Sequence, residues 1–152
     1  SSSSWGENRL INDYNIKFFW HIHNTAYLLR RQFIEQIINT DSPNYYNFLF
    51  DGSNFRGCFS ESELIAKAYA NNWGAAITNK VFVNENENYL LKNAKIIKTD
   101  IYNKNQKLYF EEGRKWLKNK YGFNNKWQMN EYVKFHYDNF FILNPNYLKY
   151  KI

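Results

Sequence analysis

The sequence predicts a single α+β domain, from its length, its apolar content and the alternation of strand-like and helix-like segments. Its 152 residues fit one domain, and a composition of 44% hydrophobic and 20% aromatic residues is ample for a buried core. No repeat and no linker divides the chain. Residues 15–152 are therefore predicted to form the domain, and residues 1–14 an N-terminal extension or a cloning remnant.

The charge favours an anionic partner. The net charge is +6 and the pI is near 9.3, which suits a dinucleotide, a nucleic acid or an acidic protein face. No apolar run approaches the roughly 20 residues that span a bilayer, so no membrane partner is predicted. The single cysteine cannot form an internal disulfide, which favours a reducing, cytoplasmic compartment and is compatible with a secreted effector.

The first part of the domain is predicted to be a strand, a helix and a loop. Residues 15–23 are apolar and aromatic enough for a central strand, and Asn24 and Thr25 are suited to cap a helix over residues 26–38. Residues 39–57 are rich in Asn, Asp, Ser and Gly around several aromatic residues. That composition is typical of an irregular loop, here a flap over a cleft.

The middle of the chain predicts a second helix between extended segments. Residues 58–60 are expected to be extended, and residues 61–72 to be helical, with Ser60 or Ser62 as the N-cap and glutamates in the first turn. Residues 75–83 have the composition of a strand.

The last part of the chain predicts strands around one more helix. Residues 84–102 are expected to form one or two strands, and residues 110–121 a basic helix that Gly122 ends. Residues 130–152 alternate apolar and polar positions on either side of a polar stretch at 136–139. They predict a hairpin with the lone carboxylate Glu131 at its mouth.

Three motifs precede this terminal segment in the chain. The motifs are His23-Asn24-Thr25, Gly57-Cys58-Phe59 and Tyr69-Ala70, and the terminal segment holds Glu131-Tyr132-Val133 with Pro145 to Leu148. In this order they resemble the ADP-ribosyltransferase superfamily, in its poly(ADP-ribose) polymerase and diphtheria-toxin-like (His-Tyr-Glu) branch. The resemblance implies two small, mostly antiparallel sheets that form an NAD+ cleft with flanking helices. It also implies an enzyme, whether a toxin or effector, a host regulator or a viral protein, that transfers ADP-ribose from NAD+ to a protein or nucleic-acid acceptor and releases nicotinamide.

The resemblance also implies roles for the matched residues. His23 and Thr25 would hold the ribose and nicotinamide, beside Asn24 in the place of the usual glycine. Phe59, after Gly57, and Tyr69 would sandwich the nicotinamide ring.

The carboxylate of Glu131 would stabilise the oxocarbenium-like transition state. Glu87, in a Glu-x-Glu pattern like that of the cholera- and pertussis-type branch, is the rival carboxylate, and His21 is the rival of His23. No metal is implied.

Other functions fit parts of the sequence. His21 and His23 with distant His136 suggest a zinc site, and Cys58 with His136 has the chain order of papain-like hydrolases. A non-enzymatic, basic and aromatic nucleic-acid-binding domain, or an inactive NAD-binding relative, is also compatible. The basic and aromatic residues concerned are Arg30, Arg31, Lys115, Trp116, Lys118, Lys120, Tyr121, Lys126 and Trp127.

Overall fold

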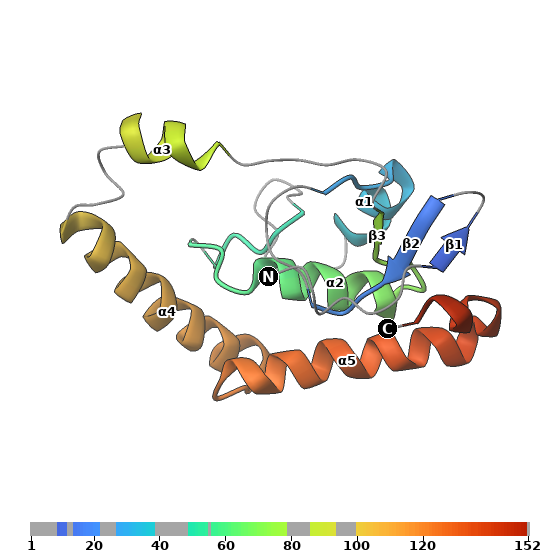
Figure 1. Cartoon of the computed structure of the whole chain (residues 1–152). Coiled ribbons are helices and arrows are strands. Elements are labelled where there is room, and N and C mark those ends of the chain that lie inside the picture. Colours follow the sequence, from blue (N-terminus) through green and yellow to red (C-terminus); the bar gives the residue numbers. More distant parts are fainter. Residues whose placement is uncertain are drawn as a thin grey trace.

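The chain folds as an α+β structure in which a small sheet lies at one end of a layer of helices (Figure 1). The computed structural model describes residues 9–11, 14–21, 27–38, 49–54, 56–78, 86–93 and 100–151. The sheet is antiparallel, in the order β1-β2-β3, and consists of β1 (Arg9–Ile11), β2 (Tyr14–Phe18) and β3 (Ala76–Thr78).

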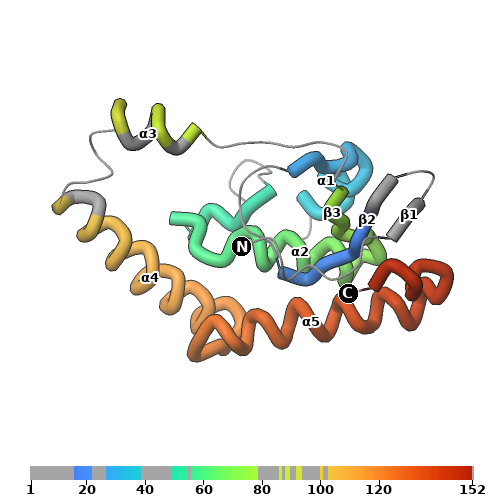
Figure 2. The backbone as a smooth tube through the Cα atoms, viewed as in Figure 1, coloured from blue at the N-terminus to red at the C-terminus, as the bar shows by residue number. Residues whose placement is uncertain are grey.

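The helices carry most of the structure. They are α1 (Arg31–Ile38), α2 (Ser60–Ala70), α3 (Glu87–Asn93), α4 (Asp100–Tyr121), α5 (Lys126–Leu143) and the 3-10 helix η3 (Pro145–Tyr150). Helix α5 runs along α2, and α4 meets α5 at an angle across the bend at residues 122–125. Helix α3 stands apart from α2 and α5, near the first turns of α4 (Figures 1 and 2). None of the helices that the structure describes is long and apolar enough to cross a membrane.

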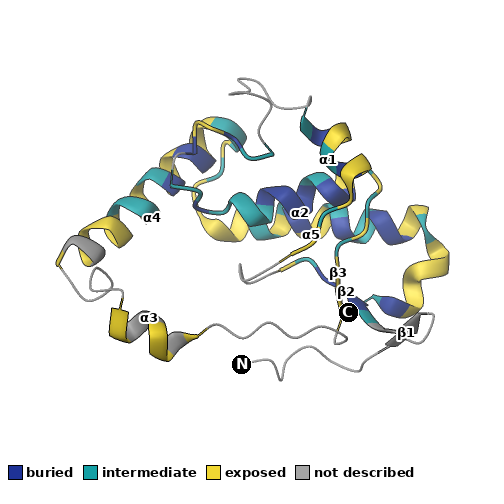
Figure 3. Cartoon of the chain, turned by 90° about the horizontal axis from the view of Figure 1, so that it is seen from above, coloured by how far each residue is buried: buried dark blue, intermediate teal, exposed yellow. Residues whose placement is uncertain are grey.

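The main core lies where α2 packs on α5, and the sheet and the end of α4 close it (Figure 3). Tyr69 of α2 meets Tyr137 and Phe140 of α5 edge to face, with ring centroids 5.3 and 5.2 Å apart. Leu117 of α4 is fully buried in the same core, and Phe18 enters it from β2. A smaller cluster packs α1 on the neighbouring face of α2.

The predicted terminal hairpin is wrong, because residues 126–143 form the long helix α5. Its buried residues Met129, Val133, Tyr137 and Phe140 recur every three or four positions, which is the spacing of one helix face. The Asn125 side chain caps the helix by accepting two backbone hydrogen bonds from the first turn. No Gly or Pro interrupts residues 126–143. A helix lets this segment bury one continuous face on α2.

The strands predicted over residues 84–102 are also wrong where the structure describes them. Residues 87–93 form α3, and α4 begins at Asp100, a full ten residues before the helix expected there. The Asn86 side chain accepts the backbone N–H of Tyr89, which is a helix-start contact. The end of α4 is confirmed: Gly122 follows it with φ +74°, a left-handed conformation that glycine adopts readily.

The first half of the chain follows the prediction more closely. Strand β2 confirms part of the strand predicted over residues 15–23, β3 confirms part of 75–83, and α1 confirms the second half of the helix predicted over 26–38. Residues 49–54 and 56–57 are irregular as expected, and the rest of that loop, 39–48 with residue 55, lies outside the described residues.

Helix α2 is confirmed, but its start is not. The expected caps Ser60 and Ser62 both lie inside the helix, and the N-cap is Phe59. Residues 58–59 form a turn where an extended segment was expected, and Phe59 has the left-handed φ of 64°. The described residues hold one sheet where the resemblance implied two.

Candidate functional site

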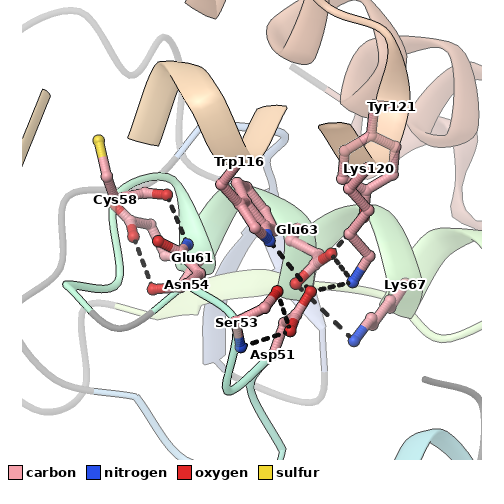
Figure 4. Close-up of polar contacts among 11 residues, drawn as sticks. Asp51, Ser53, Asn54, Cys58, Glu61, Glu63, Lys67, Trp116, Lys120 and Tyr121 are labelled. Carbon is pink, nitrogen blue, oxygen red and sulfur yellow. Dashed lines mark hydrogen bonds and ion pairs between the residues drawn. The ribbon is translucent and has the colours of Figure 1, made fainter. Parts of the chain in front are cut away.

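A buried group of charges joins three segments that are distant in the sequence (Figure 4). Asp51 comes from the loop before α2, Glu63 from α2 and Lys120 from α4, and their side chains are 6%, 2% and 24% exposed. Lys120 Nζ lies 2.8 Å from Asp51 Oδ2 and 2.7 Å from Glu63 Oε1. One ammonium therefore bridges two carboxylates that face the same point.

Neighbouring donors complete the group around Asp51. Trp116 Nε1 donates to Asp51 Oδ2 at 3.0 Å, and the Ser53 backbone N–H and hydroxyl donate to Oδ1 at 2.8 and 2.6 Å. Burial by itself raises the pKa of the Asp51 carboxyl, but the hydrogen bonds from Lys120, Ser53 and Trp116 outweigh it. The pKa of Asp51 is held well below its ordinary value, so the carboxylate is charged at neutral pH.

The carboxylate oxygens of Glu63 also have partners. The Tyr121 hydroxyl donates to Glu63 Oε1, and the Lys67 ammonium lies 3.9 Å from Oε2. Two carboxylates and two ammonium groups balance to zero charge. The charge cluster of Asp51, Glu63, Lys67 and Lys120 therefore serves to hold the loop and α4 onto α2. Glu63 and Lys67 are an i,i+4 pair within α2. Asp51 and Lys120 come from other segments, so local patterns carried no signal for their contacts with the cluster.

Tyr69 is a core residue and not an open ring face. Its side chain is buried, and its hydroxyl lies 2.6 Å from the carbonyl oxygen of Phe19 and 2.8 Å from that of Ala75. Burial raises the pKa of the Tyr69 hydroxyl, which stays protonated and bridges the sheet to α2. The aromatic rings of Tyr137 and Phe140 pack against Tyr69.

The predicted sandwich of Phe59 and Tyr69 does not form. Phe59 is the N-cap of α2 and Tyr69 lies in its last turn. Ten residues of α-helix separate the two backbones by about 15 Å, and the Tyr69 ring is already packed edge to face against Tyr137 and Phe140. Gly57 has φ +70° and belongs to the turn that starts the helix. The structure thus keeps Gly57 with Phe59 and places Tyr69 at the other end of α2.

Glu131 lies on the exposed side of α5. It is two residues from buried Val133, a rotation of about 200° around the helix, and Val133 shares the buried face with Tyr137, which contacts Tyr69. Glu131 therefore points away from Tyr69, and the two do not share a site. The expected His23, Asn24 and Thr25 lie outside the described residues.

The rival residues are also placed apart. Glu87 begins α3, which stands away from α2 (Figure 1). His21 is exposed, with its ring centroid 6.0 Å from that of Trp20. Among the residues that the structure describes, no group of His, Cys, Asp and Glu could hold a metal ion.

Cys58 and His136 belong to different surroundings. Cys58 is fully buried against Gly113 of α4, where a Cβ on that glycine would lie 2.5 Å from the Cys58 sulfur. Burial raises the pKa of the Cys58 thiol to about 11, so it is protonated at neutral pH and is no nucleophile. The His136 ring packs edge-on against Tyr132, with centroids 4.7 Å apart, and burial lowers its pKa.

The exposed side of α4 carries a row of cations. The side chains lie at spacings of three, four and seven residues, which places them on one helix face opposite buried Trp116 and Leu117. We call this the cationic face: Lys104, Lys107, Arg114, Lys115 and Lys118. Glu111 lies among them and is 3.9 Å from Lys107.

The basic and aromatic surface expected from the sequence is only partly present. Trp116 is buried, and Lys120 and Tyr121 bind Glu63, so these three serve the interior. Lys126 is exposed, and Trp127 is 65% exposed. Periodicity along α4 would have separated its exposed lysines from Trp116 and Lys120 if its full length had been recognised.

Comparison with known proteins found no matching family model, no matching curated protein and no matching solved structure.

Proposed function

We propose that the chain binds nucleic acid through the cationic face of α4. The observation that carries this proposal is the alignment of five cations on one exposed helix face with one carboxylate among them. Lys104 and Lys118 are 14 residues apart, so the row extends about 21 Å along the helix. A rigid row of this length matches a run of phosphates, which are the regularly repeated anions of a nucleic acid.

The net charge of this face sets the expected salt dependence. Five cations less one carboxylate leave four positive charges available for phosphates. Each neutralised phosphate contributes a slope of about −0.9 for duplex and about −0.7 for single strands to log K against log salt. Full engagement therefore predicts a slope near −3 to −4.

The test is binding of fluorescent oligonucleotides, measured by anisotropy between about 50 and 200 mM salt. Lys115→Gln with Lys118→Gln should weaken binding and lower the slope by about two, one for each phosphate contact. The matched control is Lys134→Gln with Lys149→Gln, which removes the same charge from exposed positions on α5 and η3. Equal losses of affinity in the two double variants would mean that only net charge matters, and the assignment of binding to α4 would be wrong.

ADP-ribosyl transfer from NAD+ stays a prediction of the sequence, as does an inactive NAD-binding relative. Incubation of the chain with labelled NAD+ separates the two, because only the transferase releases nicotinamide, whereas an inactive relative retains NAD+ intact. Glu131→Gln is the matched variant, because that side chain is exposed and its replacement leaves the core intact. Nicotinamide release that disappears in this variant would establish the transferase, and would displace nucleic-acid binding as the primary function.

A further inference from the structure

Resting on the nucleic-acid binding proposed above, we infer that the preferred ligand is a single strand whose bases stack on Phe110 and Trp127. Both rings are exposed, 47% for Phe110 and 65% for Trp127. Phe110 lies beside the cationic face, and Trp127 lies just after the bend that ends α4. Proteins that bind single-stranded nucleic acids commonly combine cations for the phosphates with exposed aromatic rings for the bases.

Phe110 stands among the cations of α4. Lys107 precedes it by three residues and Arg114 follows it by four, and both spacings make neighbours on a helix surface. The Tyr109 ring meets Phe110 edge-on, with centroids 5.1 Å apart. This perpendicular contact restrains the Phe110 ring and still leaves it 47% exposed, which suits a base that stacks between two phosphate contacts.

The Trp127 ring is in contact with the ammonium of the neighbouring Lys126. Lys126 Nζ lies 5.0 Å from the centroid of the Trp127 ring. Asn125 Oδ1 accepts the backbone N–H of Trp127 at 3.0 Å, which fixes this residue in the first turn of α5. The ring is thus presented on a capped helix start, with the Lys126 ammonium over one face and the other face left for a stacked base.

The two rings favour single strands over duplex for a steric reason. Within a duplex each base already stacks on its neighbours, so an aromatic side chain gains a partner only by unstacking them. A single strand presents open base faces and bends easily from α4 onto α5. Stacking by a ring of this kind contributes between about fivefold and a hundredfold in affinity per base.

The experiment compares oligothymidylate of about 20 nucleotides with a duplex of the same length. The variants are Phe110→Ala and Trp127→Ala, and the matched control is Phe135→Ala, which removes a ring of similar exposure, 60%, eight residues further along α5 and away from α4. Each of the first two should weaken single-strand binding by at least about fivefold. Duplex binding should be unchanged by them, and the control should leave both affinities unchanged.

The outcomes separate this inference from the function on which it rests. Equal affinity of the native chain for both probes, or single-strand binding that survives both alanine variants, overturns the inference. A continued loss in Lys115→Gln with Lys118→Gln would then still support nucleic-acid binding. If neither probe binds the native chain, both proposals are overturned. Because the three rings are exposed, unchanged thermal midpoints verify that every variant is folded.

Discussion

Replacing Lys120 with methionine tests the charge cluster most directly. Methionine is unbranched and nearly fills the space of the lysine chain, so the main change is loss of the ammonium. Asp51 and Glu63 would then face each other across a buried site without the cation that lies within 2.8 Å of both. The loop before α2 and the end of α4 would lose their common anchor.

The expected loss in free energy of unfolding is about 3 kcal/mol. Removal of one partner from a buried ion pair costs about 3 to 5 kcal/mol, and the 24% exposure of Lys120 admits some water, which favours the lower end. For a chain of this length, each kcal/mol shifts the thermal midpoint by about 2 to 4 °C. Lys120→Met should therefore lower the midpoint by about 6 to 12 °C.

The pH dependence supplies a second signature. The pKa of Asp51 is lowered by folding. Its stabilising contribution is therefore present above the unfolded pKa of about 3.9, and is lost as the pH falls from about 4 toward the folded pKa. Protonation also relieves the unpaired carboxylate in Lys120→Met. The stability difference between native chain and variant should be greatest near neutral pH and smaller at about pH 3.

Urea unfolding followed by tryptophan fluorescence measures both effects. Lys134→Met is the control, because Lys134 makes a comparable contact with Asp138 at 2.9 Å on the surface of α5, where solvent screens it. The control should unfold close to the native midpoint. Native stability of Lys120→Met at neutral pH, or a deficit that stays the same in acid, would show that the charge cluster does not anchor the loop and α4.

Three further changes probe the core. Tyr69→Phe removes the hydroxyl that contacts the carbonyls of Phe19 and Ala75 and should lower stability by about 1 to 3 kcal/mol in urea unfolding. A tyrosine that served only as a nicotinamide clamp would keep its stacking ring in this variant, and stability would be unchanged. Cys58 should resist alkylation at about pH 8 until the chain is unfolded, because burial keeps it a thiol; rapid labelling of the native chain would contradict this. Leu117→Ala, at a fully buried site, should lower stability by about 2 to 5 kcal/mol, and a calorimetric midpoint equal to the native one would refute its place in the core.

Local signals predicted helix α2 well and helix α5 badly. In α2 the acidic first turn and the apolar face both predict a helix. In α5 two periods compete: residues 132–135 alternate like a strand, while Met129, Val133 and Tyr137 keep a four-residue spacing over the full segment. The longer pattern prevails because it buries one continuous face on α2 and satisfies the backbone within the helix.

In the candidate site, too, some features could be predicted from the sequence and others could not. Exposed lysines on α4 could be inferred from sequence spacing, since helix periodicity alone assigns them to one face. The roles of Trp116 and Lys120 could not, because a basic and aromatic sequence has the same local pattern whether its side chains meet solvent or a buried carboxylate. Tyr69 was likewise ambiguous, since a core tyrosine and a ligand clamp differ only in what surrounds the ring.

The amino-acid sequence by itself determined the α+β class, the net charge of +6 and helix α2. Only the tertiary structure decided that Asp51 and Lys120, 69 residues apart, share one buried contact. It likewise decided that Glu131 and Tyr69 lie on different sides of α5. The physical reason is that helix and strand preferences act over a few residues, whereas the charge and reactivity of a side chain depend on partners brought together by packing.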